Sequence, residues 1–250
     1  MSADTNDDET QEENSLALDD SIDSQPEQTK NLNTNLDFHF VAYDEDLTIV
    51  GAKGSGKSYL ANTILQSLHG INVWVWDYNR QFHDSKSMLF HDLDEMLEAW
   101  KIMKSGKYIL QSFDNSETEF RRFCKAAFNM ANGGLVVIID EVHAYVTKQK
   151  IVKEYNDIVL SGRPRGITLV SISSRPASLP NNCLTNAKHV FEFRLNLVSD
   201  VKYLESWMGS EVWVLMPKNK RLKYKDYTEI EEHSFYYRNM DEAEGCVSKI

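Results

Sequence analysis

The stretch that decides the fold is residues 47–58, which read LTIVGAKGSGKS. Its first four residues are apolar and suit a buried strand, and the next eight match the phosphate-loop pattern G-x-x-x-x-G-K-[ST]. Residues 58–69 then place apolar side chains on one helical face, and Gly70 stands where a helix cap belongs. A strand, a glycine-rich loop and a helix in this order predict a nucleotide site.

Each residue type in this loop has a chemical role. Glycines allow a positive φ and a close approach of backbone N–H groups to phosphates, and the following helix adds the positive end of its dipole. Lys57 is suited to contact the β- and γ-phosphates, and the Ser58 hydroxyl is suited to bind Mg²⁺. The predicted nucleotide-binding residues are Gly51, Ala52, Lys53, Gly54, Ser55, Gly56, Lys57, Ser58 and Tyr59.

Charge is unevenly distributed along the 250 residues. Residues 1–36 hold ten acidic side chains and one lysine, so they carry −9 of the net charge of −11. The isoelectric point near 5.1 therefore does not argue against nucleic-acid binding by the rest of the chain. We predict that residues 1–36 form a disordered acidic tail, which is a solubilising segment, a docking peptide or an autoinhibitory mimic of DNA charge.

The three cysteines, Cys124, Cys183 and Cys246, are far apart and form no C-x-x-C pair. This spacing argues against a disulfide framework or a zinc site and favours a reducing compartment. No apolar run approaches the roughly 20 residues needed to cross a bilayer, and the amino terminus is acidic rather than basic. We therefore expect no membrane segment and a location in the cytosol or in a particle assembled there.

Short apolar segments alternate with amphipathic helical segments after the phosphate loop. Strands are predicted at 72–77, 108–113, 135–139, 167–173, 188–193 and 211–216. Helices are predicted at 92–105, from Ser116 to Gly133 and at 199–208, and a Ser116/Glu119 capping box opens the second of them. The alternation predicts an α/β fold of the RecA-like P-loop type, with a mainly parallel sheet and helices on both faces.

We place one folded domain at residues 37–225 and expect a weakly ordered polar end over residues 226–250. Sheets of this class bind ligands at the carboxyl ends of their strands. Three polar residues stand at such predicted ends, namely Asp77, Asp140 and Ser173.

Asp140 and Glu141 follow five consecutive aliphatic residues and have the form of a Walker B element. One carboxylate of such a pair holds the Mg²⁺ shell, and the next orients and deprotonates the water that attacks the γ-phosphorus. We therefore assign Asp140 to the metal and Glu141 to the general base. The glutamate favours an ATPase over a small-molecule kinase, while an ordinary acidic strand exit is the alternative interpretation.

The predicted strand at 167–173 ends in a polar pair, Ser173 and Ser174. In hydrolytic P-loop proteins with an extra strand between the phosphate-loop and Walker B strands, a polar side chain at that strand's end contacts the γ-phosphate or the attacking water. Either serine is a candidate for this sensor, and Arg175 is a further candidate for phosphate sensing. The alternative is a serine pair that simply starts a loop.

A turn rich in glycine and proline at 161–166 displays Arg163 and Arg165. The planar fork of arginine meets phosphate oxygens bidentately, so either residue suits a finger supplied to a neighbouring subunit. Such a finger would make hydrolysis depend on oligomerisation. A solvated turn is the alternative interpretation.

Five segments together resemble the HerA/FtsK superfamily of ring-forming DNA translocases. They are GAKGSGKS (51–58), VWVWD (73–77), LVVIIDEVHAY (135–145), SGRPRGITLVSISSRPASLP (161–180) and HVFEFRLNLVSDVKYLESWMG (189–209). Within the superfamily the compact chain is most similar to viral genome-packaging ATPases, over residues 38–216. The run GRPRGI, a strand, SSRP and LP is a much narrower signature than the phosphate loop.

The resemblance implies that Lys57 and Ser58 bind ATP and Mg²⁺. It also implies that Asp140 and Glu141 are the Walker B pair and that an arginine of the 163–165 turn acts across a subunit interface. Relatives usually have a glutamine where this chain has Ser174. Serine is shorter, so the sensor contact would need a bridging water or pass to Ser173.

The resemblance further implies double-stranded DNA as a partner and a homo-oligomeric ring, a pentamer or a hexamer, that acts with capsid or portal vertex proteins. No strong basic stripe is present, but a ring multiplies a few lysines per subunit around its channel. Candidate pore contacts are Lys148, Lys150 and Lys153, with a solvated helix face as the alternative. The favoured function is an ATP-driven motor that packages a viral genome into a preformed capsid, in the host cytoplasm or associated with the virion.

Other functions stay open at this point. A zonula-occludens-toxin-like assembly and export ATPase of filamentous phages resembles the same core but normally carries a membrane segment. An ATP-gated assembly factor that docks through the acidic tail would bind ATP and hydrolyse little. A nucleoside or nucleotide kinase would need an acceptor site and an arginine-rich lid, neither of which the sequence displays.

Overall fold

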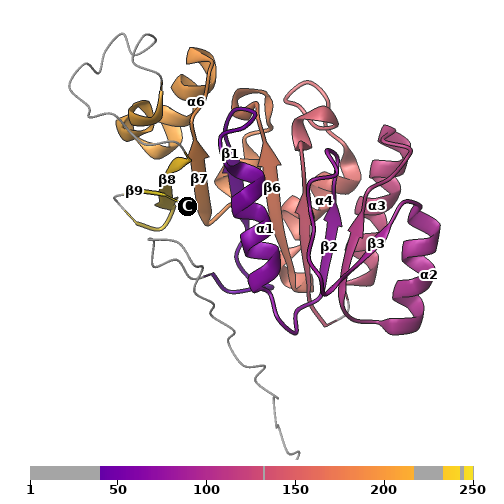
Figure 1. The fold of residues 1–250 in the computed structure, drawn as a ribbon. Helices are drawn as coiled ribbons and strands as arrows, with labels where there is room; N and C mark the ends of the chain where they lie inside the picture. Colours follow the sequence, from indigo (N-terminus) through magenta and orange to yellow (C-terminus); the bar gives the residue numbers. More distant parts are fainter. Residues whose placement is uncertain (1–39, 132, 217–232, 243–244, 250) are drawn as a thin grey trace, which may run out of the picture.

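The described strands form one nine-stranded sheet in the order β3-β4-β2-β5-β6-β1-β7-β8-β9 (Figure 1). The computed structural model describes residues 40–131, 133–216, 233–242 and 245–249, so the prediction for residues 1–36 lies outside it. The strands are β1 (Leu47–Val50), β2 (Val73–Trp76), β3 (Ser87–Phe90), β4 (Lys107–Leu110), β5 (Leu135–Ile139), β6 (Ile167–Ser173), β7 (His189–Phe193), β8 (Ser234–Asn239) and β9 (Cys246–Lys249). All pairs from β3 to β7 are parallel, whereas β8 and β9 are antiparallel additions. The predicted mainly parallel sheet is confirmed.

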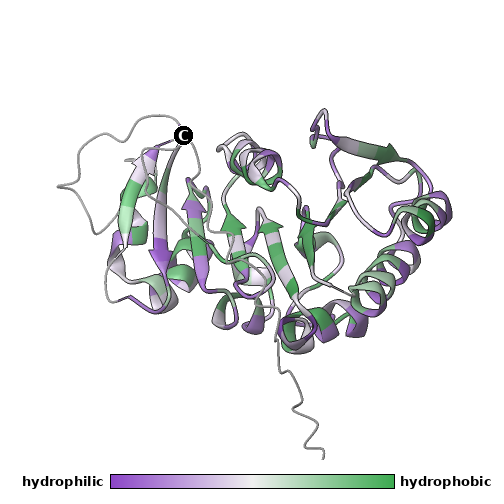
Figure 2. Ribbon diagram, turned by 90° about the horizontal axis from the view of Figure 1, so that it is seen from below, coloured by the Kyte–Doolittle hydropathy of each residue, from purple (hydrophilic) through white to green (hydrophobic). Residues whose placement is uncertain are grey.

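Helices cover both faces of the sheet. They are α1 (Lys57–Ser67), α2 (Leu93–Met103), α3 (Glu117–Met130), α4 (Lys153–Ser161), α5 (Asn182–Thr185) and α6 (Val198–Met208), with short 3-10 helices η1 (Val142–Ala144), η2 (Arg163–Arg165), η3 (Pro176–Ser178) and η4 (Ser210–Leu215). Successive strand residues face opposite sides: Val73 and Val75 pack with α1, and Trp74 and Trp76 pack with α2 and α3. The strands are accordingly apolar on both sides, while the outer sides of the helices are polar (Figure 2).

The predicted helix starts on this sheet are confirmed at two caps. The Asp92 side chain accepts a hydrogen bond from the Glu95 backbone N over 3.0 Å, and the Ser116 side chain accepts one from the Glu119 backbone N over 3.2 Å. Each cap satisfies a backbone donor that the first turn of a helix leaves unpaired. No helix among the described residues is long and apolar enough to span a bilayer.

The strand predicted at 211–216 is wrong, because these residues lie in and just after η4. Gly209, with a φ of 94°, turns the chain after α6. Val212 and Leu215 then pack against α6 and β8 within an apolar cluster instead of joining the sheet. Apolar runs of this length do not by themselves distinguish a strand from a short buried helix.

The weakly ordered end expected over residues 226–250 is also corrected in its described part, where β8 and β9 extend the sheet. Phe235 packs in the cluster under α1, and Tyr236 packs in the cluster under α6. The segment is polar on average, so its composition did not indicate this short strand. Strand β3 and the bounds of helix α4 were not predicted.

β6 lies between β1 and β5, and all three are parallel. Their carboxyl ends therefore meet at one edge of the sheet, which we call the carboxyl edge. The opposite edge, where these strands begin, is the amino edge. This topology brings the phosphate loop, the Walker B pair and the serine pair together.

Candidate functional site

The phosphate loop connects the carboxyl end of β1 to the amino end of α1. Gly54 and Gly56 have positive φ angles of 74° and 115°, and Gly56 caps α1. A side chain at either position would be strained in this left-handed backbone. The turn presents the positive end of the eleven-residue helix α1 at the carboxyl edge, where it favours an anion.

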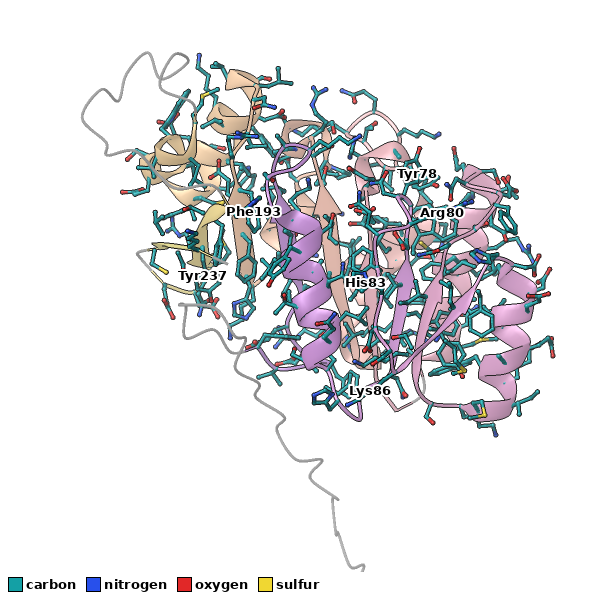
Figure 3. All side chains as sticks on the ribbon, in the orientation of Figure 1. Tyr78, Arg80, His83, Lys86, Phe193 and Tyr237 are labelled. Atoms are coloured by element: carbon teal, nitrogen blue, oxygen red, sulfur yellow. The ribbon has the colours of Figure 1, made fainter. Side chains whose placement is uncertain are left out.

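Neighbouring strands fix the start of this loop. The Gly51 backbone N donates to the carbonyl of Ser173 over 3.2 Å, and the Ala52 backbone N donates to the carbonyl of Arg194 over 2.7 Å. A Cβ atom on Gly51 would lie only 2.5 Å from the Cβ atom of Phe193, which Figure 3 labels on β7. Glycine is thus required here for close packing as well as for conformation.

Two side chains of the loop are buried and suited to an anionic ligand. Lys57 is 5% exposed, and its Nζ donates to the carbonyl of Ala52 over 3.1 Å. Burial lowers the pKa of Lys57, and the charges of Glu141 and Asp140 partly oppose this shift. The Ser55 hydroxyl is buried with no hydrogen-bond partner among the described residues. A buried ammonium and an unpaired buried hydroxyl in one loop fit phosphate oxygens as ligands.

Asp140 follows β5 directly and is 1% exposed. Its Oδ2 accepts hydrogen bonds from the Asn79 backbone N over 3.3 Å and from Asn79 Nδ2 over 3.0 Å. Burial, helped by the charges of Glu141 and Asp77, raises the pKa of Asp140 to about 6. A buried carboxylate of this kind is stabilised by a cation, so Asp140 fits the predicted metal position.

No group of three or more His, Cys, Asp or Glu side chains within the described ranges is arranged to hold a metal ion by itself. Magnesium does not require such a cage, because it commonly binds one or two protein oxygens together with phosphate oxygens and water. The hydroxyl of Ser58 and the carboxylate of Asp140 supply hard oxygen ligands of this type. The residues present therefore fit a nucleotide-bound Mg²⁺ ion.

Glu141 has a left-handed backbone, with a φ of 49°, and it opens η1. Its Oε2 accepts hydrogen bonds from the Ser174 backbone N over 3.3 Å and from Ser174 Oγ over 3.1 Å, and it lies 3.1 Å from His143 Nδ1. Burial alone would raise the pKa of Glu141, but His143, the charge of Lys57 and the Ser174 hydrogen bond lower it below its usual value. Glu141 is therefore ionised at neutral pH, as a general base must be.

Of the two predicted sensor serines, Ser174 is the one that contacts Glu141. The hydroxyl of Ser173 is buried, accepts from the Arg175 backbone N over 3.1 Å and lies 3.2 Å from His143 Nδ1. The Arg175 side chain is half exposed and pairs with Asp200 of α6 over 3.3 Å. A pocket of about 220 Å³ opens beside the loop and is lined by Ala52, Lys53, Ser174, Arg175, Asn196, Leu197 and Asp200.

Two residues of this site were not predicted, Asn79 and His143. Asn79 holds both Walker B carboxylates, since its Nδ2 also lies 3.5 Å from Glu141 Oε1. It belongs to the loop after β2, in which Tyr78 and Arg80 lie near the carboxyl edge (Figure 3). Asn79 lies two residues after the predicted strand end, and His143 lies two after Glu141. That proximity was the only available signal.

Asp77 lies at the carboxyl edge as predicted, but its contacts are those of a turn. Its two oxygens accept from the backbone N of Gln81 and of Phe82, each over 2.9 Å, and Oδ2 accepts from Gln111 Nε2 over 2.8 Å. Burial raises the pKa of Asp77, and these hydrogen bonds oppose the shift. The carboxylate therefore orders the loop that carries Asn79.

Arg163 and Arg165 do not join the other candidate residues. They form η2, just before β6, and so lie at the amino edge. Arg163 Nε pairs with Asp44 Oδ1 over 2.6 Å, and the Arg165 guanidinium lies 4.2 Å from the centre of the Phe128 ring. Both side chains are exposed. Within one chain neither belongs to the nucleotide site, so a role at ATP requires a second subunit.

The three predicted pore lysines each contact a group of their own chain. Lys148 Nζ lies 3.6 Å from the centre of the Tyr203 ring, and burial lowers the pKa of Lys148. Lys150 pairs with a carboxylate of α3, that of Glu117, and Lys153 pairs with a carboxylate one turn later in α4. The side chains of Lys150 and Lys153 are 54% and 77% exposed.

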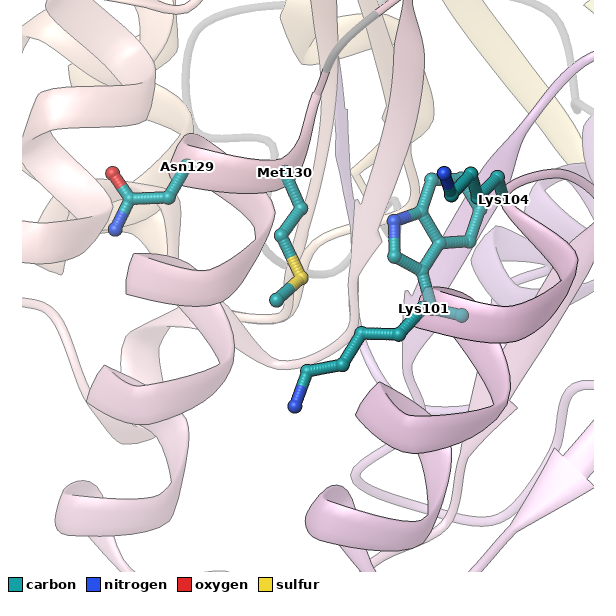
Figure 4. Close-up of a pocket in the computed structure, with 5 residues that line it drawn as sticks. Lys101, Lys104, Asn129 and Met130 are labelled. Atoms are coloured by element: carbon teal, nitrogen blue, oxygen red, sulfur yellow. The ribbon is translucent and has the colours of Figure 1, made fainter.

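A pocket of about 440 Å³ lies away from this site, between the carboxyl ends of α2 and α3 (Figure 4). Trp100, Lys101, Lys104, Asn129 and Met130 line it. These helix ends lead into β4 and β5, so the pocket opens near the amino edge. The pocket is therefore separate from the phosphate loop, which lies at the carboxyl edge.

A comparison with family models identifies residues 47–195 as a match to the ATPase family associated with various cellular activities (AAA). This match covers more than half of the chain and includes the phosphate loop, the Walker B pair and the serine pair. No curated protein matches the chain.

Solved structures share the fold at low sequence identity. The genome packaging NTPase B204 from Sulfolobus turreted icosahedral virus 2, in complex with ATP-gammaS, has a TM-score of 0.63 at 19% identity over 83% of this chain and 98% of its own. The DNA-packaging ATPase B204 from Sulfolobus Turreted Icosahedral Virus gives 0.61 at 20% identity, over 82% of this chain and 97% of its own. EssC (ATPases 2 and 3) from Geobacillus thermodenitrificans gives 0.54 at 14% identity, over 86% of this chain and 41% of its own. The predicted P-loop ATPase fold is thereby confirmed.

Proposed function

The chain belongs to the AAA family of ATPases, and from this premise we propose that it is a motor that moves double-stranded DNA and packages a viral genome into a preformed capsid. The observation that carries the proposal is the meeting of a complete phosphate loop with Asp140 and Glu141 at one sheet edge. The fold is shared with proteins described as genome packaging NTPases, and this supports the proposal at the level of architecture.

Binding of ATP would begin at the phosphate loop. The Lys57 ammonium would exchange its hydrogen bond to the Ala52 carbonyl for phosphate oxygens, and the Ser55 hydroxyl would gain the partner that it lacks. These groups are already buried and placed, so little ordering is needed when the nucleotide binds. Ser58 and Asp140 would hold Mg²⁺, which neutralises developing phosphate charge when bound.

Hydrolysis would depend on Glu141, whose carboxylate is ionised and held beside the end of β6. A carboxylate in this position accepts a proton from water as the water oxygen attacks the γ-phosphorus. Asn79 would orient the Walker B pair through both carboxylates, and positioning is the larger part of catalysis in phosphoryl transfer.

Assembly would complete the site. Arg163 and Arg165 lie at the amino edge of their own subunit, exposed and unable to reach the phosphate loop of the same chain. In a ring, one of them would meet the nucleotide of a neighbour and stabilise the charge of the transition state. Turnover would then require a pentamer, a hexamer or another closed oligomer.

DNA would be gripped through its phosphates rather than its bases. Lys150 and Lys153 have exposed side chains, and each subunit of a ring would contribute its own pair. The existing ion pairs would have to exchange for DNA phosphates, so we expect the grip to weaken steeply with salt. Capsid or portal vertex proteins would be the further partners, in the host cytoplasm or in the virion.

The proposal is tested by ATP turnover of the full chain with and without linear double-stranded DNA, together with displacement of a triplex-forming strand from that DNA. Stimulation of at least about tenfold together with displacement that needs ATP supports the motor. ATP binding with near-zero hydrolysis under both conditions would favour an ATP-gated assembly factor instead. Rapid turnover that ignores DNA would contradict translocation but leave the ATPase intact.

A further inference from the structure

The imidazole of His143 contacts polar groups at the ends of two neighbouring strands of the carboxyl edge. Its Nδ1 lies 3.1 Å from Glu141 Oε2 and 3.2 Å from Ser173 Oγ, and its Nε2 lies 3.4 Å from Ser174 Oγ. Glu141 follows β5, whereas the serines end the neighbouring strand β6. One ring therefore connects the general base of the proposed function to both serines.

The hydrogen on Nδ1 follows from the chemistry of its neighbour. An ionised carboxylate can only accept hydrogen bonds, so the ring nitrogen that faces Glu141 must be a donor. In the neutral ring the other nitrogen, Nε2, is then an acceptor. Ser173 Oγ can share the Nδ1 donor, because it already acts as an acceptor for the Arg175 backbone N.

The hydroxyl of Ser174 has one hydrogen and two acceptors within reach. Glu141 Oε2 lies 3.1 Å from Ser174 Oγ, and His143 Nε2 lies 3.4 Å from it on another side. The shorter contact, to an ionised acceptor, is the stronger of the two. If the carboxylate instead engages a water, rotation of the hydroxyl redirects its hydrogen to Nε2, so that the hydroxyl keeps an acceptor.

We propose that His143 is a positioning residue for ATP hydrolysis, which orients Glu141 through Nδ1 and offers Nε2 as the second acceptor that lets the Ser174 hydroxyl release Glu141. This inference rests on the assignment of Glu141 as the general base. Without the imidazole, the carboxylate is the only acceptor that the described side chains offer to the Ser174 hydroxyl, which then keeps occupying the oxygen that must take a proton from water. Glu141 also loses the side-chain donor that fixes its orientation.

The experiment measures steady-state ATP turnover, nucleotide affinity and thermal unfolding of the full chain in the absence of DNA. His143→Ala is expected to lower kcat at least about tenfold, as a lost hydrogen bond to a charged group does, with KM, nucleotide affinity and Tm unchanged. His143→Gln keeps one donor and one acceptor on a side chain of similar reach, so its kcat is expected to stay within about threefold of the parent. His83→Ala, which removes an exposed imidazole from the loop before β3, is the matched control and should leave kcat unchanged.

Ser174→Ala provides the second half of the test. It removes the hydroxyl that would otherwise stay on Glu141, so we expect His143→Ala to lower kcat less in the Ser174→Ala background than in the parent, with only the loss of the Nδ1 contact to Glu141 remaining. If His143→Ala does not fold, His143→Phe, which keeps a ring without either nitrogen, takes its place in both backgrounds. A parental kcat in His143→Ala overturns the proposal, and so does an equally large loss from His143→Ala in both backgrounds or a fall in kcat that follows Tm in every variant.

Because turnover is measured without DNA, the outcome is independent of translocation. Failure of DNA to stimulate the parent would remove the motor function and leave the role of His143 to be judged on basal kcat. Conversely, if DNA stimulates the parent and His143→Ala keeps the parental kcat, the motor function stands and the role assigned to His143 is wrong.

Discussion

The two edges of the sheet hold their polar groups in different ways. At the amino edge, two side chains accept from backbone N–H groups: the Asp46 carboxylate accepts from the Leu169 backbone N over 2.7 Å, and Thr168 Oγ1 accepts from the Tyr43 backbone N over 2.9 Å. Other side chains there pair with each other, as Arg163 does with Asp44. At the carboxyl edge, side chains such as Glu141 mainly contact other side chains, which can exchange partners. From this difference we expect the amino edge to maintain the fold and the carboxyl edge to carry out the proposed hydrolysis.

This contrast predicts separable effects. Substitutions at the carboxyl edge should change turnover with little effect on unfolding, and substitutions at the amino edge should do the reverse. Asp77 lies at the carboxyl edge, but its oxygens accept mainly from backbone N–H groups. We therefore expect substitution of Asp77 to affect unfolding more than turnover. The partners of a side chain, rather than its edge alone, decide its role.

The largest expected effect is that of Lys57→Ala. Removal of the buried ammonium should abolish measurable ATP binding and lower turnover by at least about a thousandfold, since the other lysine of the loop, Lys53, is exposed. Calorimetric titration with ATP and a turnover assay measure both quantities. Lys86→Ala, an exposed lysine before β3, should match the parent, and undiminished binding in Lys57→Ala would contradict the phosphate site.

The next effect is that of Glu141→Gln, which preserves the shape and the Ser174 contact but cannot accept a proton. We expect turnover to fall about a thousandfold while ATP affinity and Tm stay near those of the parent, in the range known for removal of a general base. Single-turnover assays with excess protein measure the chemical step directly. Retained hydrolysis would remove the base assignment and reopen the kinase alternative.

The third effect tests whether the amino edge has a catalytic role between subunits. Arg163→Ala and Arg165→Ala should each leave ATP binding intact, and one of them should lower turnover by about a hundredfold or more, as loss of an arginine finger does. Mixing that variant with Lys57→Ala should restore turnover, because mixed rings contain sites with an intact loop and an intact arginine.

This mixing experiment tests whether the amino edge of one subunit acts at the carboxyl edge of another, since neither the arginine variant nor Lys57→Ala is active alone. Light scattering with a non-hydrolysable ATP analogue establishes whether a ring forms in each sample. Absence of complementation in samples that do assemble would assign the arginines to the structural role that their contacts with Asp44 and Phe128 already provide.

Sequence patterns identified the carboxyl edge because its chemistry is local. The phosphate loop fits within eight consecutive residues, and the Walker B pair directly follows a strand that is apolar throughout. The expectation that Ser174 contacts the γ-phosphate or its water stays a prediction. Its contact with Glu141 was not predicted, because a contact between the ends of β5 and β6 depends on which strands are neighbours. His143 and Asn79 were missed for the same reason.

The amino edge was not predictable, because it is built from contacts between distant residues. The Tyr43 ring lies against Gly134, and its backbone N bonds to Thr168, yet no local pattern connects these positions. Composition misled at β8, where a polar average concealed buried Phe235 and Tyr236. It also misled at η4, whose apolar run is compatible with either a strand or a buried helix.

The fourth effect therefore belongs to the amino edge and to stability. In Gly134→Ala the new Cβ would lie 2.7 Å from the Tyr43 ring, in a backbone with a φ of 97°. We expect a loss of about 2 to 3 kcal/mol in the free energy of unfolding, from collision and strain together. Gly133→Ala is the matched control, because its φ is 90° but its Cβ meets nothing within 4 Å.

Denaturant titration of both glycine variants separates the two costs. The control should lose only about 1 kcal/mol, from backbone strain. Basal kcat at a temperature where both variants remain folded should equal that of the parent. A changed kcat in Gly134→Ala would break the division between the two edges.

The smallest effect concerns Asp46, whose burial raises its pKa from 3.8 to about 7, against the opposing hydrogen bond from Leu169. A carboxyl group with a raised folded pKa contributes stability that is fully present below the unfolded value of 3.8 and is lost as pH rises through about 7. Asp46→Asn keeps an acceptor for the Leu169 backbone N without the charge. The variant should therefore be more stable than the parent by on the order of 1 kcal/mol at pH 8, with the advantage shrinking towards pH 4.

Urea unfolding followed by tryptophan fluorescence at several pH values measures this difference. Asp44→Asn is the control, because Asp44 lies two residues before Asp46 and is exposed. It removes an equal charge and should change stability by less than about 0.5 kcal/mol. Because Asp46 lies at the edge opposite the phosphate loop, ATP affinity should be the same in parent and variant at every pH. An advantage of Asp46→Asn that did not grow with pH would mean that the carboxylate is better solvated than its burial implies, and the amino edge would then owe its stability to packing around Tyr43 rather than to polar contacts.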